Sequence, residues 1–142
     1  MPTQILLIQI GALLHFGILI ASALVPGALN WRDELQSLNQ LSRRLIWVHG
    51  GFIVLVIIGF GVTALVGAEQ LAGGTLLARC LCAFIGVFWL ARLAVQFLIF
   101  DVRGYLRTAF LRVGYHSLTG VFAYLGGVFT WTAISPAGAA PM

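Results

Sequence analysis

The chain has 142 residues, of which 61% are hydrophobic and only 8% are charged. A soluble domain carries about 25% charged residues, so a soluble chain of this composition would lack the polar side chains that cover a core. The net charge is +4 and the basic residues are all arginines, but no nucleic-acid recognition motif accompanies them. We therefore expect a single-domain integral membrane protein, residues 1–142, and no nucleic-acid partner.

Four apolar runs follow one another along the chain, and each is longer than the about 20 residues that cross a bilayer core. Ala21-Ser22-Ala23 fits a signal-peptidase pattern, but no positive residue precedes the first run, so we expect this run to be retained as a helix. Pro26-Gly27 is expected to break its end. The predicted transmembrane helices cover Gln4–Leu29, Leu45–Val66, Leu76–Phe100 and Leu106–Ile134.

The connection between the first two runs contains a short amphipathic pattern. Trp31, Leu35 and Leu38 recur at helical spacing. Asn30 can cap the start of a helix, and the arginines at 43–44 would occupy its last turn. This pattern predicts a short interfacial helix in the first loop, with its tryptophan among the lipid headgroups.

The placement of the arginines predicts the orientation of the spans. The first loop holds Arg32, Arg43 and Arg44, and the third loop holds Arg103 and Arg107. Because basic loops remain in the cytoplasm, we expect both loops to be cytoplasmic and both termini to lie on the other side of the membrane. The three short connections favour an all-α, up-down-up-down four-helix transmembrane bundle.

Polar side chains lie inside these apolar runs and mark a candidate site. Arg92 and Gln96 are one helical turn apart in the third run, and His15, His49 and His116 each lie in a different one of the others. An arginine at membrane depth costs at least about 2.5 kcal/mol on insertion scales and needs a partner. We expect a structural polar network around Arg92 and Gln96, with snorkelling of Arg92 toward the headgroups as its alternative.

Cofactor sites are alternatives to this structural network. His49 and His116 lie at similar distances from the arginines that flank their spans. They could ligate a b-type haem between facing helices, with Arg92 against a propionate, or could bind a quinone headgroup. His15, His49 and His116 could instead form a metal site for copper or zinc, although His15 falls nearer the midplane.

The sequence favours no catalytic chemistry. It contains no G-x-S-x-G, no H-E-x-x-H and no phosphate-binding loop. Cys80 and Cys82 would point about 200° apart on a helix, which disfavours a disulfide between them. We therefore expect a non-catalytic protein, a small subunit or packing partner of a larger membrane complex. Its partners would be the lipid bilayer and other membrane subunits or further copies of itself.

The run W-x-x-R-x-x-x-Q-F-x-x-F-D, Trp89 to Asp101, is the most distinctive segment of the chain. Together with WVHGGF and VPGALNW, it resembles segments of small, uncharacterised bacterial four-span inner-membrane proteins. The resemblance covers most of the chain. It implies a bacterial inner-membrane location and a four-helix fold, and it implies no activity and no site residue.

Overall fold

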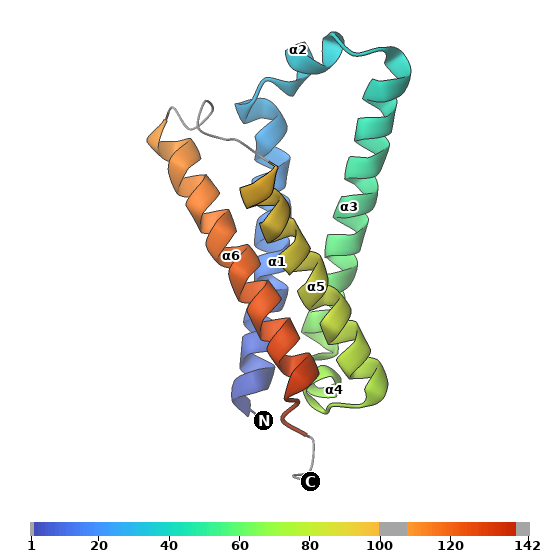
Figure 1. Ribbon diagram of the computed structural model, residues 1–142, viewed down its shortest axis with the longest axis vertical. Helices are drawn as coiled ribbons and strands as arrows, with labels where there is room; N and C mark the ends of the chain where they lie inside the picture. Colours follow the sequence, from blue (N-terminus) through green and yellow to red (C-terminus); the bar gives the residue numbers. More distant parts are fainter. Residues whose placement is uncertain (1, 100–107, 139–142) are drawn as a thin grey trace.

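The computed structural model describes residues 2–99 and 108–138 of the chain. Within these residues the secondary structure consists of helices, with no strand. Four helices are long and apolar enough to cross a membrane, and they run alternately up and down in Figure 1. The predicted all-α four-helix bundle is confirmed. In chain order the helices are α1 (Pro2–Ala28), α2 (Trp31–Gln36), α3 (Gln40–Val66), α4 (Ala68–Ala72), α5 (Leu76–Leu98) and α6 (Ala109–Ile134).

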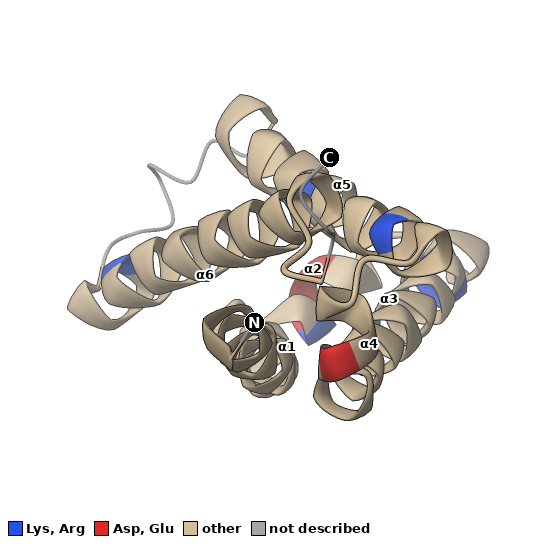
Figure 2. Ribbon diagram, turned by 90° about the horizontal axis from the view of Figure 1, so that it is seen from below, with Lys and Arg blue, Asp and Glu red and all other residues tan. Residues whose placement is uncertain are grey.

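Charged side chains are sparse on the four long helices. Figure 2 shows them as short coloured segments on helices that are otherwise uncharged, with both signs present on α2. A bilayer core offers no hydrogen-bonding partner, so a crossing segment must satisfy its backbone internally. Long uncharged α-helices meet that requirement, and the molecule is a multi-pass membrane protein by the length and composition of these helices.

Two helix ends differ from the expectation. α1 continues past Pro26 for two more residues, because a proline so near a helix end removes a single backbone hydrogen bond and leaves little helix to kink. The interfacial helix is shorter than predicted: α2 ends at Gln36, and residues 43–44 belong to α3. The cause is a second cap, since the Asn39 side chain accepts a 2.8 Å hydrogen bond from the Ser42 backbone N–H and starts α3 there.

Asn30 forms the bend between α1 and α2. Its backbone is left-handed, with φ 49°, a conformation that asparagine tolerates better than most residues. The predicted capping role is wrong in one respect, because its side chain makes no capping hydrogen bond to α2.

The core lies at the end of the bundle that holds α4. The buried residues of α3 begin at Ile57, and those of α1 end at Ile18. On α6 they run from Phe122 to Ala133. Toward α2 the long helices diverge (Figure 1). The bundle is therefore closely packed at one end and open at the other.

Two glycines allow α5 and α6 to cross closely. A Cβ added at Gly86 would lie 2.9 Å from the backbone nitrogen of Thr130, and one added at Gly126 would lie 2.8 Å from Cγ of Leu90. Small residues at such crossings let two backbones approach within a membrane, where packing replaces the hydrophobic effect as the force between helices.

We predict that Gly86→Ala destabilises the protein, because the new methyl group meets the backbone of α6 and the helices must move apart. Overpacking of this kind costs about 1–3 kcal/mol. Thermal unfolding in detergent measures the effect. Gly120→Ala is the matched control, since a Cβ at Gly120 meets nothing within 4 Å. Equal melting temperatures for the two variants would contradict the close crossing.

Candidate functional site

His15 lies at the centre of the packed end, and its side chain is fully buried. Its Nδ1 lies 2.7 Å from the carbonyl oxygen of Gly11, and the indole Nε1 of Trp89 lies 2.9 Å from its Nε2. A carbonyl can only accept and an indole N–H can only donate. The imidazole therefore carries its hydrogen on Nδ1 and accepts at Nε2, so both ring nitrogens are engaged.

Aromatic rings from the three other long helices surround this imidazole. The ring centroids of Phe60, Trp89 and Phe129 lie 6.1, 5.3 and 5.9 Å from that of His15, all edge to face. These residues belong to α3, α5 and α6, whereas His15 belongs to α1. One side chain thus contacts every long helix of the bundle. We call His15, Phe60, Trp89 and Phe129 the histidine hub.

The structure does not bring the three histidines of the predicted metal site together. Among the residues it describes, no group of three or more His, Cys, Asp or Glu side chains could hold a metal ion. His49 precedes Phe60 by eleven residues, which places it about 16 Å along α3 from the hub. Because Nδ1 of His15 donates to Gly11 and its Nε2 accepts from Trp89, this histidine has no lone pair left to offer.

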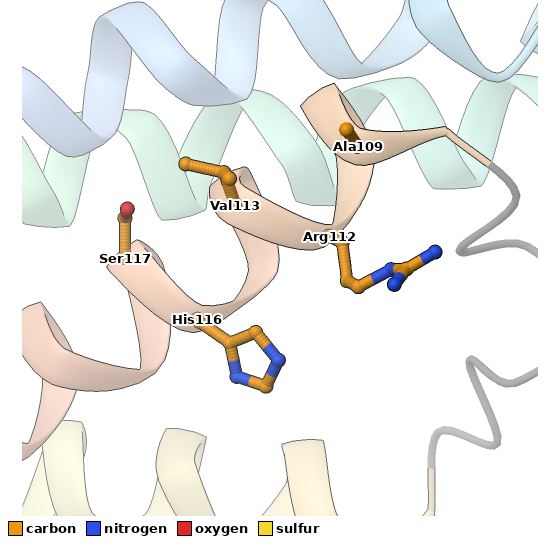
Figure 3. A pocket seen from close by; sticks show the side chains of 5 residues that line it. All are labelled: Ala109, Arg112, Val113, His116 and Ser117. Atoms are coloured by element: carbon orange, nitrogen blue, oxygen red, sulfur yellow. The ribbon is translucent and has the colours of Figure 1, made fainter.

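His49 and His116, the two predicted haem ligands, are both exposed. Nδ1 of His49 lies 3.0 Å from the carbonyl oxygen of Leu45, one turn earlier on α3. The ring of His116 meets the edge of Tyr115, its neighbour on α6, at 5.5 Å. Figure 3 shows His116 beside Arg112, both projecting from the same side of α6. These contacts of the two histidines are thus to their own helices, which diverge at this end.

Gln96 and Arg92 both lie on the seam between α5 and α6. The buried Gln96 amide donates a hydrogen bond to Oγ1 of Thr119, which in turn donates to the carbonyl oxygen of Tyr115 at 2.8 Å. The guanidinium carbon of Arg92 lies 5.9 Å from the ring centroid of Phe122, within the range of a cation–π interaction. The predicted polar pair therefore reaches two separate partners on α6. Asp101, the partner of the snorkelling alternative, lies outside the described residues.

Gln4 is a structural polar residue that sequence reasoning missed. Its buried amide donates to the carbonyl oxygen of Ser135 at 3.1 Å, and its Oε1 accepts from the backbone N–H of Ala137 at 2.6 Å. These bonds join the start of α1 to the end of α6. The only signal in the sequence was a lone amide at the edge of an apolar run, which a headgroup contact would explain equally well.

Arg79 performs a similar role on α5. Its Nε donates a 2.8 Å hydrogen bond to the carbonyl oxygen of Ala133, in the last turn of α6. Nearby, the backbone N–H of Gly138 donates to the carbonyl oxygen of Ala72 at the end of α4. Side chains and backbone thus satisfy the carbonyl groups that helix ends leave open, and they fix the closed end of the bundle.

Comparison of the chain with protein-family models, with curated proteins and with solved structures found no match.

We predict that Trp89→Phe destabilises the protein by about 1–3 kcal/mol, because it leaves Nε2 of His15 buried without a donor. A double-mutant cycle with His15→Leu isolates this interaction, and thermal unfolding in detergent measures each corner. The two substitutions should couple by at least about 0.5 kcal/mol, as residues in direct contact do. Additive effects would show that the indole and the imidazole stabilise the bundle independently.

Proposed function

We propose that this protein is a non-catalytic small subunit or packing partner of a larger membrane complex, and that α3 is the helix through which it docks. The proposal also includes a bacterial inner-membrane location, with α2 on the cytoplasmic side. The arginines at 32 and 43–44, in and after α2, support this orientation because basic loops remain in the cytoplasm.

The observation that carries the docking proposal is the exposure of the first part of α3. No residue of this helix before Ile57 is buried, so residues 40–56, about 25 Å of helix, are left largely uncovered by the described residues. Large apolar side chains occupy this length on every side, including Trp47 at 54% and Phe52 at 64% exposure. Lipid can cover such side chains, so the apolar surface alone does not require a protein partner.

Two adjacent features of α3, an exposed histidine and a pair of glycines, favour contact with a protein helix over contact with lipid. His49 is an exposed polar side chain within an apolar segment, and hydrocarbon offers its Nε2 no hydrogen bond. Gly50 and Gly51 follow it, and a Cβ at either would meet nothing within 4 Å. Glycines allow another helix to approach the backbone closely, and polar side chains bond across such interfaces. A partner helix would satisfy both features together.

We predict that Gly51→Leu abolishes a stoichiometric assembly without unfolding the bundle, because the new side chain occupies the surface to which the partner would pack. Native mass spectrometry of protein extracted in mild detergent measures the assembly. The mass of the adduct distinguishes a second copy of this chain from a different subunit. Circular dichroism checks the fold.

Gly127→Leu is the matched control for this experiment. Gly127 is exposed on α6, and a Cβ there also meets nothing within 4 Å. The Gly127→Leu variant should leave the assembly intact. A wild-type protein that is monomeric in native mass spectrometry, from several mild detergents, would contradict the docking proposal, as would equal loss of the assembly in both glycine variants.

A haem or quinone site is the second candidate, and one observation at His49 favours it. An imidazole that ligates a metal commonly donates its other N–H to a carbonyl group, which fixes the ring and leaves one nitrogen open. The contact of Nδ1 with the carbonyl oxygen of Leu45 gives His49 this arrangement. His116 or a partner subunit would have to supply a second ligand.

The haem candidate predicts a Soret band in protein purified without added cofactor, with a shift on reduction by dithionite. His49→Ala should remove the band, whereas His15→Leu should leave it, because both nitrogens of His15 are already hydrogen-bonded, to Gly11 and Trp89. A featureless visible spectrum from freshly extracted protein would exclude haem. Organic extraction followed by chromatography then tests for a quinone.

A further inference from the structure

The histidines of α1 and α3 bond to their own helices in the same way. Nδ1 of His15 lies 2.7 Å from the carbonyl oxygen of Gly11. Nδ1 of His49 lies 3.0 Å from the carbonyl oxygen of Leu45. Each carbonyl belongs to the residue four positions earlier, and a carbonyl oxygen can only accept a hydrogen bond. Nδ1 therefore carries the hydrogen in both rings, and Nε2 of each ring is an acceptor.

The two Nε2 atoms differ in what they meet. Nε2 of His15 accepts the indole N–H of Trp89 at 2.9 Å, inside the histidine hub. Nε2 of His49 has no hydrogen-bond partner among the residues that the structure describes, and the side chain of His49 is exposed. His49 thus has the arrangement of His15 without the donor. Hydrocarbon cannot supply one.

The surface around His49 is apolar. Ile46, Phe52 and Ile53 lie within about one turn of it on the same side of α3, and all three are exposed. None of these side chains can donate a hydrogen bond. A helix that packs on this side of α3 must therefore bring the donor itself.

We propose that the partner that docks on α3 is a helix of a different membrane protein, and that this helix donates an uncharged N–H group to Nε2 of His49. The donor is an indole or a carboxamide. This inference rests on the docking of α3 proposed above, and it adds the chemistry by which the partner is recognised.

The acceptor at His49 disfavours a second copy of this chain as the partner. Copies that share one orientation in the membrane are related by a two-fold axis along the membrane normal, so each residue at the axis faces its own equivalent. A symmetric pair on this side of α3 would bring two Nε2 acceptors together with no hydrogen between them. Both would be covered and left unbonded, which is costly. A helix with a donor avoids this cost.

The polar contacts within the bundle indicate which donors suit a neighbouring helix. Thr119 and Thr132 donate to carbonyl oxygens of their own helix, at 2.8 and 2.9 Å. A hydroxyl has one hydrogen, so these groups cannot also donate to another helix. The N–H groups of Gln4, Trp89 and Gln96 do reach side chains of other helices. A charged donor would add the cost of a charge inside an apolar segment.

A synthetic membrane helix tests the donor directly. It contains about twenty leucines flanked by lysines, with the fifth leucine replaced either by tryptophan or by phenylalanine, which lacks the indole N–H. The fifth position matches His49, which lies five residues after Arg44. Native mass spectrometry of the full-length protein with each peptide, in mild detergent, measures the two affinities. We expect the tryptophan peptide to bind about threefold more tightly, the mean effect of one hydrogen bond between membrane helices.

Three variants assign this preference to His49. His49→Leu should bind both peptides equally, because the acceptor is lost. His49→Gln should retain the preference, because its amide oxygen accepts at a similar reach. His116→Leu is the matched control, since it removes an exposed histidine from α6 and should leave the preference unchanged. Circular dichroism confirms that each variant is folded.

The outcomes separate this inference from the docking proposal. Equal affinity of the wild-type protein for the two peptides, or a preference that His49→Leu retains, would overturn the donor. The docking of α3 is judged by the assembly of the wild-type protein, which needs no peptide, so either proposal can fail alone. A wild-type dimer that His49→Leu dissociates would identify a second copy as the partner. A Soret band that His49→Ala removes would assign Nε2 to a haem iron, and both results would overturn the donor.

Discussion

The hydrogen bond from the Trp89 indole to the His15 imidazole is the interaction on which the packed end of this bundle depends. Within a membrane the hydrophobic effect does not hold helices together, since lipid chains are as apolar as leucine. An unpaired polar atom in the core is costly, so a buried donor and acceptor bring their helices into one arrangement. The aromatic rings of α3 and α6 then pack around the same imidazole. All four long helices therefore contact one another through the histidine hub.

The polar groups near this end are arranged on the same principle. Gln4 joins α1 to the end of α6, and Arg79 joins α5 to α6. Farther along the α5–α6 seam, Gln96 bonds to Thr119. Each bond runs between elements and restricts the rotation of a helix about its own axis. The glycines at the α5–α6 crossing add close packing to these directional contacts. The positions and rotations of the helices at this end are therefore fixed by specific hydrogen bonds and close packing.

The diverging end has the opposite character. Here α3 is exposed along its first half, an apolar groove separates α1 from α6, and His49, Arg112 and His116 are exposed. The polar side chains face outward, where lipid headgroups or other membrane proteins would lie. The closely packed end stabilises the fold. The diverging end leaves its side chains free to contact lipids or other membrane proteins.

The sequence alone determined the all-α class, the four spans and their order. Apolar runs of this length have one stable form in a bilayer, and connections this short leave one simple arrangement of neighbouring helices. The sequence also placed Gln96 and Arg92 inside a span, but it did not give their partners on α6. Only the tertiary structure decided that His15 belongs to a structural hub, that Thr119 bonds to Gln96, and that Gln4 joins two helices. The physical reason is that lipid-facing and core-facing side chains are both apolar in a membrane helix. The 3.6-residue pattern that marks the buried face of a soluble helix is therefore faint here, and the rotation of each helix follows from contacts that distant residues make.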